Sequence, residues 1–311
     1  MQVDLLNELK GISWIRSNGK HWVLVGKKLW ICSQDGTMIV CKEDIPNAHT
    51  LCFLPDDRLL LCGGNGTSYR LFSLEDGKEI WTVPHIKKMS VTGPRFAVSS
   101  DGKWAFDFYD WKGSYCFVKI DLTTGTIDTF ELRGGLRAIV DIICDAEDRI
   151  LLLQTQYDQL DGRHICENEV RQVDLTTKKT ERLHYWQMDA PFIAKGFLGC
   201  ATRVLTQNLC AVDVASGAAS SIVANTPEWE KPGLGPHDFW FAPETKYLCV
   251  AYDNANVIID LQEKKMVARY SGRFIKGYLR KNQYWMPTEI GVESKPFPLI
   301  EEIPPRKLTY F

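Results

Sequence analysis

Apolar runs long enough to cross a bilayer are absent from this chain of 311 residues. Its first ten residues, MQVDLLNELK, include acidic side chains and lack the apolar stretch of a secretory signal. An excess of charge of one sign is also lacking, because the formal net charge is −2 and the isoelectric point is near 6.3. Nucleic acid or an anionic membrane, as a main partner, would require a concentrated positive field. We therefore expect a cytoplasmic protein whose partners are neither nucleic acid nor membrane.

Sequence motifs for catalysis and for cofactors are missing as well. The chain contains no GxSxG, no HExxH and no glycine-rich phosphate loop, and its six histidines show no paired spacing. The ten cysteines form no CxxC pair, and most lie in β-rich runs that suit a small buried hydrophobe. We therefore expect reduced thiols in the core, no cofactor, no bound metal and no catalytic activity.

The chain does contain a repeat. One segment combines aliphatic, polar and turn residues and occurs six times. A Ser or Asp in it serves as a marker, and from marker to marker the spacings are 40, 48, 53, 39 and 47 residues; the markers are Ser33, Ser73, Asp121, Asp174, Asp213 and Asp260. These spacings are close to the length of one blade of a β-propeller. The six copies are ICSQDGTM (31–38), FSLEDGKE (72–79), IDLTTGTI (120–127), VDLTTKKT (173–180), VDVASGAA (212–219) and IDLQEKKM (259–266).

A second segment lies upstream of these copies and supports the same repeat independently. It combines a turn, then Lys or Arg, then a β-rich run, as in PDDRLLL (55–61), SDGKWAF (100–106) and AEDRILL (146–152). Gly and Asp tolerate the positive φ of tight turns, so both segments predict antiparallel hairpins. Each repeat is therefore predicted to have four strands, a to d, which in the second repeat are His49–Leu54, Arg58–Cys62, Ser68–Leu74 and Lys78–Pro84.

The repeat predicts a closed ring of sheets. A single four-stranded sheet cannot bury both of its faces, so such units stack radially, and about seven of them close a ring. We predict an all-β fold, a seven-bladed β-propeller of four-stranded antiparallel blades, in which residues 1–311 form a single domain. Either Val3–Leu9 or Lys307–Phe311 is expected to pair with the outer edge of the last blade and close the ring.

Two of the repeated segments resemble a known superfamily. SSDGKWAF (99–106) and IDLTTGTI (120–127) are similar to the SPDGK-type and DLxTG-type elements of WD-repeat and YVTN-type propellers, and the pattern covers nearly the whole chain. The Trp-Asp and Gly-His pairs of true WD repeats are absent, so the hydrogen-bond network of that family is not carried over. The resemblance implies the fold and says little about function, since propellers serve many functions.

Loop lengths provide the first functional hypothesis. In a propeller the a–b and c–d turns lie on one face, and the b–c and d–a connections lie on the other. Here the long insertions are b–c or d–a connections: Tyr109–Ser114, Gln156–Asn168 and Asn225–Gly235. Long loops on a rigid scaffold collect binding residues, and Trp, Tyr and Arg often anchor protein interfaces. The candidate partner-binding residues are Tyr109, Trp111, Lys112, Tyr157, Arg163, His164, Trp229 and Lys231. Alternatively, the aromatic residues fold back and cap the blade ends.

The innermost strands provide a second hypothesis. Alignment on the a–b turn places four charged residues of alternating sign in one column, with two histidines in the adjacent column. This column would line the central channel and could hold a small ligand, or its charges could pair with one another and plug the channel. Two histidines without a third ligand do not predict a metal site. The residues are Arg95, Asp141, Lys195, Asp238, His49 and His237.

From the sequence we therefore expect a non-enzymatic protein-binding scaffold or adaptor that uses its b–c and d–a face. The alternative is an enzyme, or a binder of small anionic ligands, that uses the central channel. Propeller enzymes assemble their sites from one or two residues per blade, so the missing motifs do not exclude this alternative.

Overall fold

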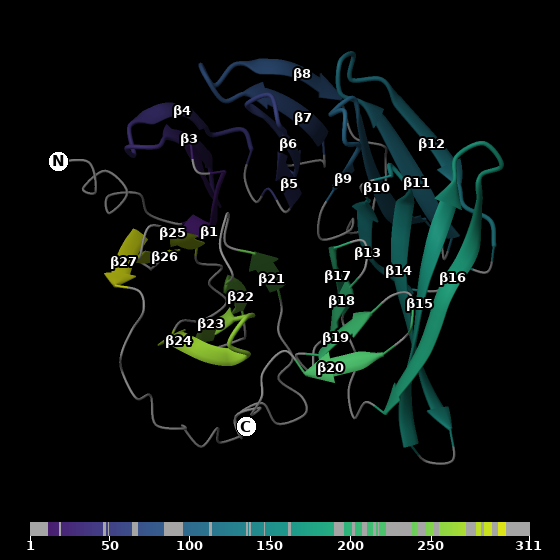
Figure 1. Ribbon diagram of the computed structural model, residues 1–311. Coiled ribbons are helices and arrows are strands. Elements are labelled where there is room, and N and C mark those ends of the chain that lie inside the picture. The colour runs from purple at the N-terminus through teal and green to yellow at the C-terminus, as the bar shows by residue number, and fades with distance from the viewer. Residues whose placement is uncertain are drawn as a thin grey trace. The chain divides into compact units, whose positions relative to one another are not determined.

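Seven β-sheets make up the described part of the chain, which Figure 1 shows as a computed structural model. None of the described residues belongs to a helix long and apolar enough to span a membrane. The structure describes residues 12–18, 20–45, 48, 50–63, 68–83, 96–111, 114–134, 136, 138–145, 147–160, 163–189, 196–200, 203–206, 210–213, 216, 218–221, 238–241, 247–251, 255–271, 278–280, 283–287 and 292–296.

Each sheet is one blade, and its strands lie side by side in chain order. Blade one contains β1 (Ile12–Ser17), β2 (His21–Gly26), β3 (Leu29–Ser33) and β4 (Met38–Lys42). Blade two contains β5 (Thr50–Phe53), β6 (Arg58–Gly63), β7 (Ser68–Ser73) and β8 (Glu79–Val83). Blade three contains β9 (Ala97–Val98), β10 (Trp104–Trp111), β11 (Ser114–Asp121) and β12 (Ile127–Glu131). Blade four contains β13 (Ala138–Cys144), β14 (Ile150–Leu160), β15 (Arg163–Asp174) and β16 (Lys179–Asp189).

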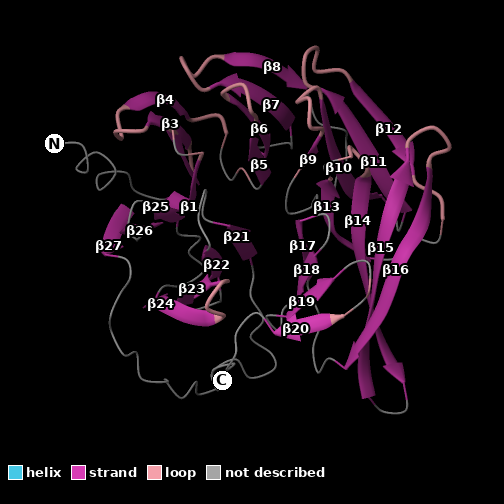
Figure 2. Ribbon diagram, in the orientation of Figure 1, coloured by secondary structure: helices cyan, strands magenta, loops and turns pink. Residues whose placement is uncertain are grey.

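The remaining blades follow the same order. Blade five contains β17 (Gly196–Cys200), β18 (Arg203–Thr206), β19 (Cys210–Asp213) and β20 (Ala219–Ser221). Blade six contains β21 (Asp238–Phe241), β22 (Tyr247–Ala251), β23 (Ala255–Asp260) and β24 (Lys265–Ser271). The last sheet has three described strands, β25 (Tyr278–Arg280), β26 (Gln283–Pro287) and β27 (Val292–Pro296). Figure 2 shows that strands joined by loops and turns account for all of these blades.

The predicted propeller of four-stranded antiparallel blades is confirmed, and in blade two the predicted and observed strands agree closely. By their contacts the strands form two compact units, Met1–Asn47 with Asn208–Cys210 and Ser221–Phe311, and Ala48–Gln207 with Ala211–Ser220. Closure of the ring by Val3–Leu9 or by Lys307–Phe311 stays a prediction, because both segments lie outside the described residues.

The c–d turns of four blades share a backbone conformation and a carboxylate or hydroxyl marker. The fourth residue after the Ser or Asp marker has positive φ, and it is Gly77 or Gly125 in two blades but Lys178 or Lys264 in two others. Glycine adopts this region freely, whereas a side chain makes it costly. Asp121 also accepts hydrogen bonds from the backbone N–H groups of the residues two and three positions later, at 2.8 and 3.1 Å, which stabilises the turn.

A β-bulge interrupts the outer strand d in four blades. The pairing between strands c and d skips one residue, and that residue is aliphatic each time. A bulge raises the local twist and makes an outer edge a poorer template for pairing with another chain. The four skipped residues are Ile39, Ile80, Leu183 and Val267.

Apolar side chains of neighbouring blades form the core. One cluster joins blade two to blade three through residues such as Leu60, Leu71 and Val118. Another joins blade three to blade four through Phe117 and Leu152, both of which are fully buried. Each face of blade three is therefore covered by a different neighbour, as the repeat pattern requires.

Polar contacts between turns tie the same blades together. The guanidinium of Arg58 and the indole N–H of Trp81, both in blade two, donate to the backbone carbonyl of Leu122 in blade three, at 2.8 and 3.3 Å. The backbone N–H and hydroxyl of Ser100 donate to the Asp148 carboxylate of blade four, at 2.7 and 2.9 Å. Hydrogen bonds between the a–b and c–d turns therefore connect blade two to blade three and blade three to blade four.

Gly125→Ala should destabilise the protein much more than Gly102→Ala. Both glycines have positive φ, at 74° and 65°, and each substitution should cost about 1 kcal/mol for this conformation. A Cβ at Gly125 would lie 2.9 Å from Cδ2 of Trp81, whereas at Gly102 the nearest atom would be Cδ of Pro55 at 3.8 Å. The clash with Trp81 should add a further ~1–3 kcal/mol. Urea unfolding measures both changes, and equal losses would show that Trp81 does not pack as described.

Candidate functional site

Blade four differs from the other described blades in the length of its strands. β14, β15 and β16 have 11, 12 and 11 residues, whereas β6 and β8 of blade two have 6 and 5. β13 pairs with β14 only as far as Thr155, but β14 and β15 stay paired to their tip at Leu160 and Arg163. Three strands therefore extend the b–c end of this blade beyond the end of β13 (Figure 1).

Two of the predicted long loops are strands, so the loop prediction is wrong for them. Gln156–Asn168 forms the ends of β14 and β15, and Tyr109–Ser114 forms the ends of β10 and β11. Only two residues separate the strands in each case. In Gln156–Asn168 the Asp161-Gly162 pair is a strong hairpin signal. The third predicted loop, Asn225–Gly235, lies outside the described residues.

Tyr109 is a core residue and not a rim contact, because only 5% of it is exposed. It packs in the cluster between blades two and three. Burial, together with a hydrogen bond and charge repulsion involving Cys116, raises the pKa of Tyr109 to about 12. Its position on β10 points it into this core, and the sequence alone gave the wrong environment for it.

The other predicted rim residues are placed only in part. Trp111 ends β10, Tyr157 lies on β14, and Arg163 and His164 begin β15, so all four are strand residues near b–c tips. Their side chains lie outside the described residues, as do Lys112, Trp229 and Lys231 altogether. Their role in partner binding stays a prediction.

The predicted channel column is largely outside the described residues. Of its members, only Asp141 has a described side chain, which is fully buried on β13. Asp238 is placed as the first residue of β21 by its backbone. Arg95, Lys195, His49 and His237 lie outside the described residues, so the channel hypothesis stays a prediction.

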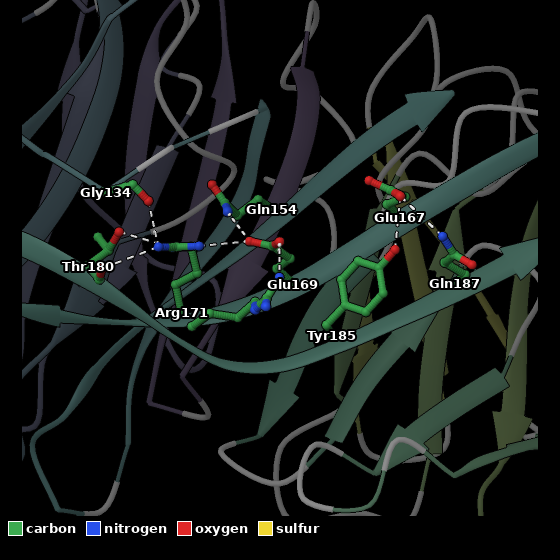
Figure 3. Close-up of polar contacts among 9 residues, drawn as sticks. Gly134, Gln154, Glu167, Glu169, Arg171, Thr180, Tyr185 and Gln187 are labelled. Atoms are coloured by element: carbon green, nitrogen blue, oxygen red, sulfur yellow. Dashed lines mark hydrogen bonds and ion pairs between the residues drawn. The ribbon is translucent and has the colours of Figure 1, made fainter. Parts of the chain in front are cut away.

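A polar network lies just below the extended end of blade four, where β13 is still paired, and Glu169 is at its centre. The Glu169 carboxylate accepts hydrogen bonds from Gln154 at 2.8 Å, from Arg171 at 2.9 Å and from Arg182 at 3.4 Å. Figure 3 shows Gln154 and Arg171 pointing toward this carboxylate. Glu169 and Gln154 are 6% and 1% exposed, so their polar atoms depend on one another rather than on water.

Arg171 connects this network to the chain segment that leads from blade three to blade four. Its guanidinium donates to the Thr180 hydroxyl at 3.0 Å, to the Thr180 carbonyl at 3.2 Å and to the Gly134 carbonyl at 2.5 Å. Gly134 has a φ of 123°, and a Cβ there would lie 2.7 Å from the Thr180 hydroxyl. Only glycine fits so close to Thr180, and this close approach lets Arg171 reach the backbone.

The charges of the network set the protonation of Glu169. Burial by itself would raise the pKa of this carboxyl, but hydrogen bonds from Arg171 and Gln154 and the positive charge of Arg171 outweigh burial and lower the pKa. Glu169 is therefore ionised at neutral pH and forms a nearly buried ion pair with Arg171, whose side chains are 8% and 11% exposed.

An exposed tyrosine continues the network toward the b–c tip. The Tyr185 hydroxyl donates to Glu167 at 2.9 Å, and the Gln187 amide donates to the same carboxylate oxygen at 3.1 Å, as Figure 3 shows. The Arg182 guanidinium lies 5.5 Å from the centre of the Tyr185 ring, within range of a cation–π interaction. Tyr185 is 42% exposed, one of only three large hydrophobic side chains exposed in the described part of the chain. Its orientation is fixed before any partner binds.

A second buried polar pair lies between blades two and three, and the sequence did not reveal it. The Tyr69 hydroxyl donates to the Asp107 carboxylate at 3.0 Å, and Asp107 is fully buried. Burial, followed by the Asp107 charge, raises the pKa of Tyr69 well above its ordinary value. Asp107 lies between Phe106 and Phe108 on β10 and opposite the buried Val118, and its spatial neighbour Tyr69 provides a polar partner in this apolar setting.

The described residues contain few groups with nucleophilic or metal-binding chemistry. No group of three or more His, Cys, Asp or Glu side chains among them could hold a metal ion. The cysteines with described side chains are free thiols, and burial raises the pKa of Cys32 and Cys144 to about 12. Such thiols are protonated at neutral pH and are weak nucleophiles. What this part of the chain displays is a rigid polar and aromatic surface.

Comparison with known proteins supports the fold alone. No family model and no curated protein matches the chain. Among solved structures, the β-propeller domain of Cps50 (Swd1) from Myceliophteria thermophila is similar with a TM-score of 0.66 at 12% identity, covering 92% of this chain and 96% of that one. Hydrazine synthase from Kuenenia stuttgartiensis has a TM-score of 0.65 at 10% identity, covering 93% and 96%. The C-terminal WD40 domain of Sif2 has a TM-score of 0.54 at 10% identity, covering 92% and 80%. The chain therefore has a WD40-like β-propeller fold.

Glu169→Gln should lower the free energy of unfolding by about 2–4 kcal/mol, because it leaves the Arg171 guanidinium without its buried anion. The pKa of Glu169 is lowered on folding, so its stabilising effect is complete above its ordinary pKa of 4.5 and is lost as the pH falls through the lower folded value. Urea unfolding measures the difference in unfolding free energy between wild type and Glu169→Gln. This difference should therefore shrink as the pH falls below 4.5.

Glu79→Gln is the matched control for this measurement. Glu79 pairs with Arg70 at 3.2 Å in blade two, where the side chains are 31% and 16% exposed. A more exposed pair contributes less, so this variant should lose under about 1 kcal/mol. Equal losses in the two variants, or a difference that does not change with pH, would contradict the role assigned to Glu169.

Proposed function

We propose that this chain is a non-catalytic protein-binding scaffold that works in the cytoplasm and contacts its partner through the b–c ends of its blades. The base of the extended end of blade four carries this proposal, since Tyr185 is held there on a rigid polar network and its hydroxyl reaches Glu167 in the first row of the extension. Strands position side chains more firmly than loops do, and an aromatic side chain that is already ordered loses little entropy on binding.

The tips of blades three and four belong to the same surface. Their a–b turns are joined through Ser100 and Asp148, so the opposite ends of their b strands extend in a common direction. Trp111 and Arg163 stand at these two tips. Trp, Tyr and Arg are the residues that most often dominate binding energy in protein interfaces. The proposed contact surface therefore includes Trp111, Arg163 and Tyr185.

Tyr185→Ala should weaken capture of the partner by about 1–2 kcal/mol, the usual effect of truncating an interface anchor. The measurement is affinity capture with quantitative mass spectrometry, followed by titration of the protein that is enriched. Folding should be retained, because the Tyr185 side chain is largely outside the core. Trp111→Ala and Arg163→Ala should act in the same direction.

Ile80→Ala is the control, because Ile80 is similarly exposed at 48% but lies on the outer strand of blade two. Binding should be unchanged in this variant. If Ile80→Ala abolishes capture while the blade-four variant does nothing, the proposed surface is wrong. If only Arg95→Ala or Lys195→Ala matters, the central channel is the binding site.

A further inference from the structure

The outer edge of blade four is basic where β16 begins. Arg133, Lys178, Lys179 and Arg182 are all exposed there. Arg133 and Lys179 form an isolated parallel β-bridge, which brings the segment after β12 against the start of β16. We call these four residues the basic edge.

The basic edge lacks the local carboxylates that neutralise lysines at other turns. Within the described residues, Arg133, Lys178 and Lys179 form no ion pair, whereas three lysines at turns of other blades do, namely Lys78 with Asp76, Lys103 with Asp101 and Lys265 with Glu263.

The reason lies in the turn of blade four. Asp174 accepts hydrogen bonds from the backbone and the hydroxyl of Thr177, so its carboxylate is committed to the turn itself. Arg182 contacts Glu169 at 3.4 Å, but that carboxylate is already bound more closely by Arg171. Glu181 is the one acidic residue that lies among the cations on β16.

The backbone at this edge is suited to pairing with an extended segment. β16 is the last strand of its sheet, and the bridge is closed by hydrogen bonds from Arg133 N to Lys178 O and from Thr180 N to Arg133 O, at 3.1 and 2.9 Å. Arg133 therefore occupies the backbone of the edge at Lys178–Thr180, which leaves the part of β16 beyond it for a partner strand.

Beyond its bulge, β16 is a regular edge. From His184 to Asp189 it pairs in unbroken register with β15. The outer strands β4 and β12 have five residues each, whereas β16 has 11. Long regular edges invite pairing with other chains, and proteins usually shorten or twist them. An edge of this length is explained if a partner covers it.

We propose that an acidic, extended segment of a partner protein adds beside β16, with its carboxylates against the basic edge. This inference rests on the proposed scaffold function and specifies the chemistry of the partner. Main-chain hydrogen bonds would supply affinity, and the exposed cations of the basic edge would select acidic over basic segments. Lys178 also lies 4.8 Å from the centre of the Phe130 ring, which holds its ammonium group at this edge. Tyr185 would lie beside the added strand, where aromatic and β-branched residues pair well. Nucleic acid is disfavoured by the net charge of −2.

The test uses synthetic peptides with capped ends, roughly nine residues long, which is within the usual length of a strand. One alternates Glu with Val and the other alternates Lys with Val. The acidic peptide should bind the full-length protein, the basic peptide should not, and binding should weaken as salt is raised. Hydrogen exchange should show new protection of backbone amides in β16 on binding.

The variant Lys178→Glu/Lys179→Glu should weaken binding of the acidic peptide by about tenfold or more, because two attractive contacts become repulsive. The matched control is Lys264→Glu/Lys265→Glu, since IDLQEKKM in blade six is the same repeat segment as VDLTTKKT in blade four. Lys265 already pairs with Glu263, and binding by this control should change less than about twofold.

Several results would overturn the proposal: no binding of the acidic peptide to wild type, equal binding of the basic peptide, or equal losses in the two variants. Tighter binding of a duplex DNA of similar charge would assign the edge to nucleic acid instead. If the peptide does not bind but capture of a protein partner still depends on Tyr185, only this inference fails. If neither depends on blade four, the proposed function fails as well.

Discussion

The need to bury both faces of every blade is the constraint on which the rest of this structure depends. A blade alone is a thin sheet with two apolar faces, and it is stable only between neighbours. Blade three shows this directly, since Val118 packs toward blade two and Phe117, the next residue back along β11, packs toward blade four. The alternation of side chains along one strand therefore builds two different cores. Hydrogen bonds between turns, such as those from Arg58 and Ser100, then fix the position of each of these blades along its neighbour.

The polar network of blade four lies where the packing of this blade against blade three ends. Along β14, Leu152 packs in the core with blade three, whereas Gln154, two residues later on the same face, is hydrogen-bonded to Glu169. β13 stops pairing at Thr155, so the strands beyond it continue without the inner strand. Buried charge at such a boundary is tolerated only when it is paired and hydrogen-bonded, and Arg171 provides this for Glu169. The result is an extension that is polar yet rigid, which is a suitable base for a contact surface.

The basic edge and the exposed Tyr185 belong to one strand, β16, and this continuity links the two proposals. Arg182 takes part in both, since its guanidinium contacts Glu169 and lies over the Tyr185 ring. The bulge at Leu183 separates the part of the edge that is bridged to Arg133 from the regular part beyond. A partner segment that adds along β16 would therefore lie near the cations where β16 begins and near Tyr185 beyond the bulge.

The sequence by itself determined the repeat, the plan of four-stranded antiparallel blades and the chemistry of the turns. These features are local: positive φ at Gly125 or Gly77, and the capping carboxylate of Asp121, depend only on residues a few positions apart. The loop prediction for Gln156–Asn168 rested on the length of the insertion, whereas its Asp161-Gly162 pair is a local hairpin signal.

Only the tertiary structure decided which side chains are exposed and which charges are paired. Tyr109 is buried because blade two covers it, and Asp107 is accommodated because Tyr69 reaches it from that blade. Arg171 meets Gly134 across 37 positions of sequence, and the cations of the basic edge meet because the segment after β12 runs parallel beside the start of β16. Burial and pairing depend on atoms that are distant along the chain, so no local pattern could specify them.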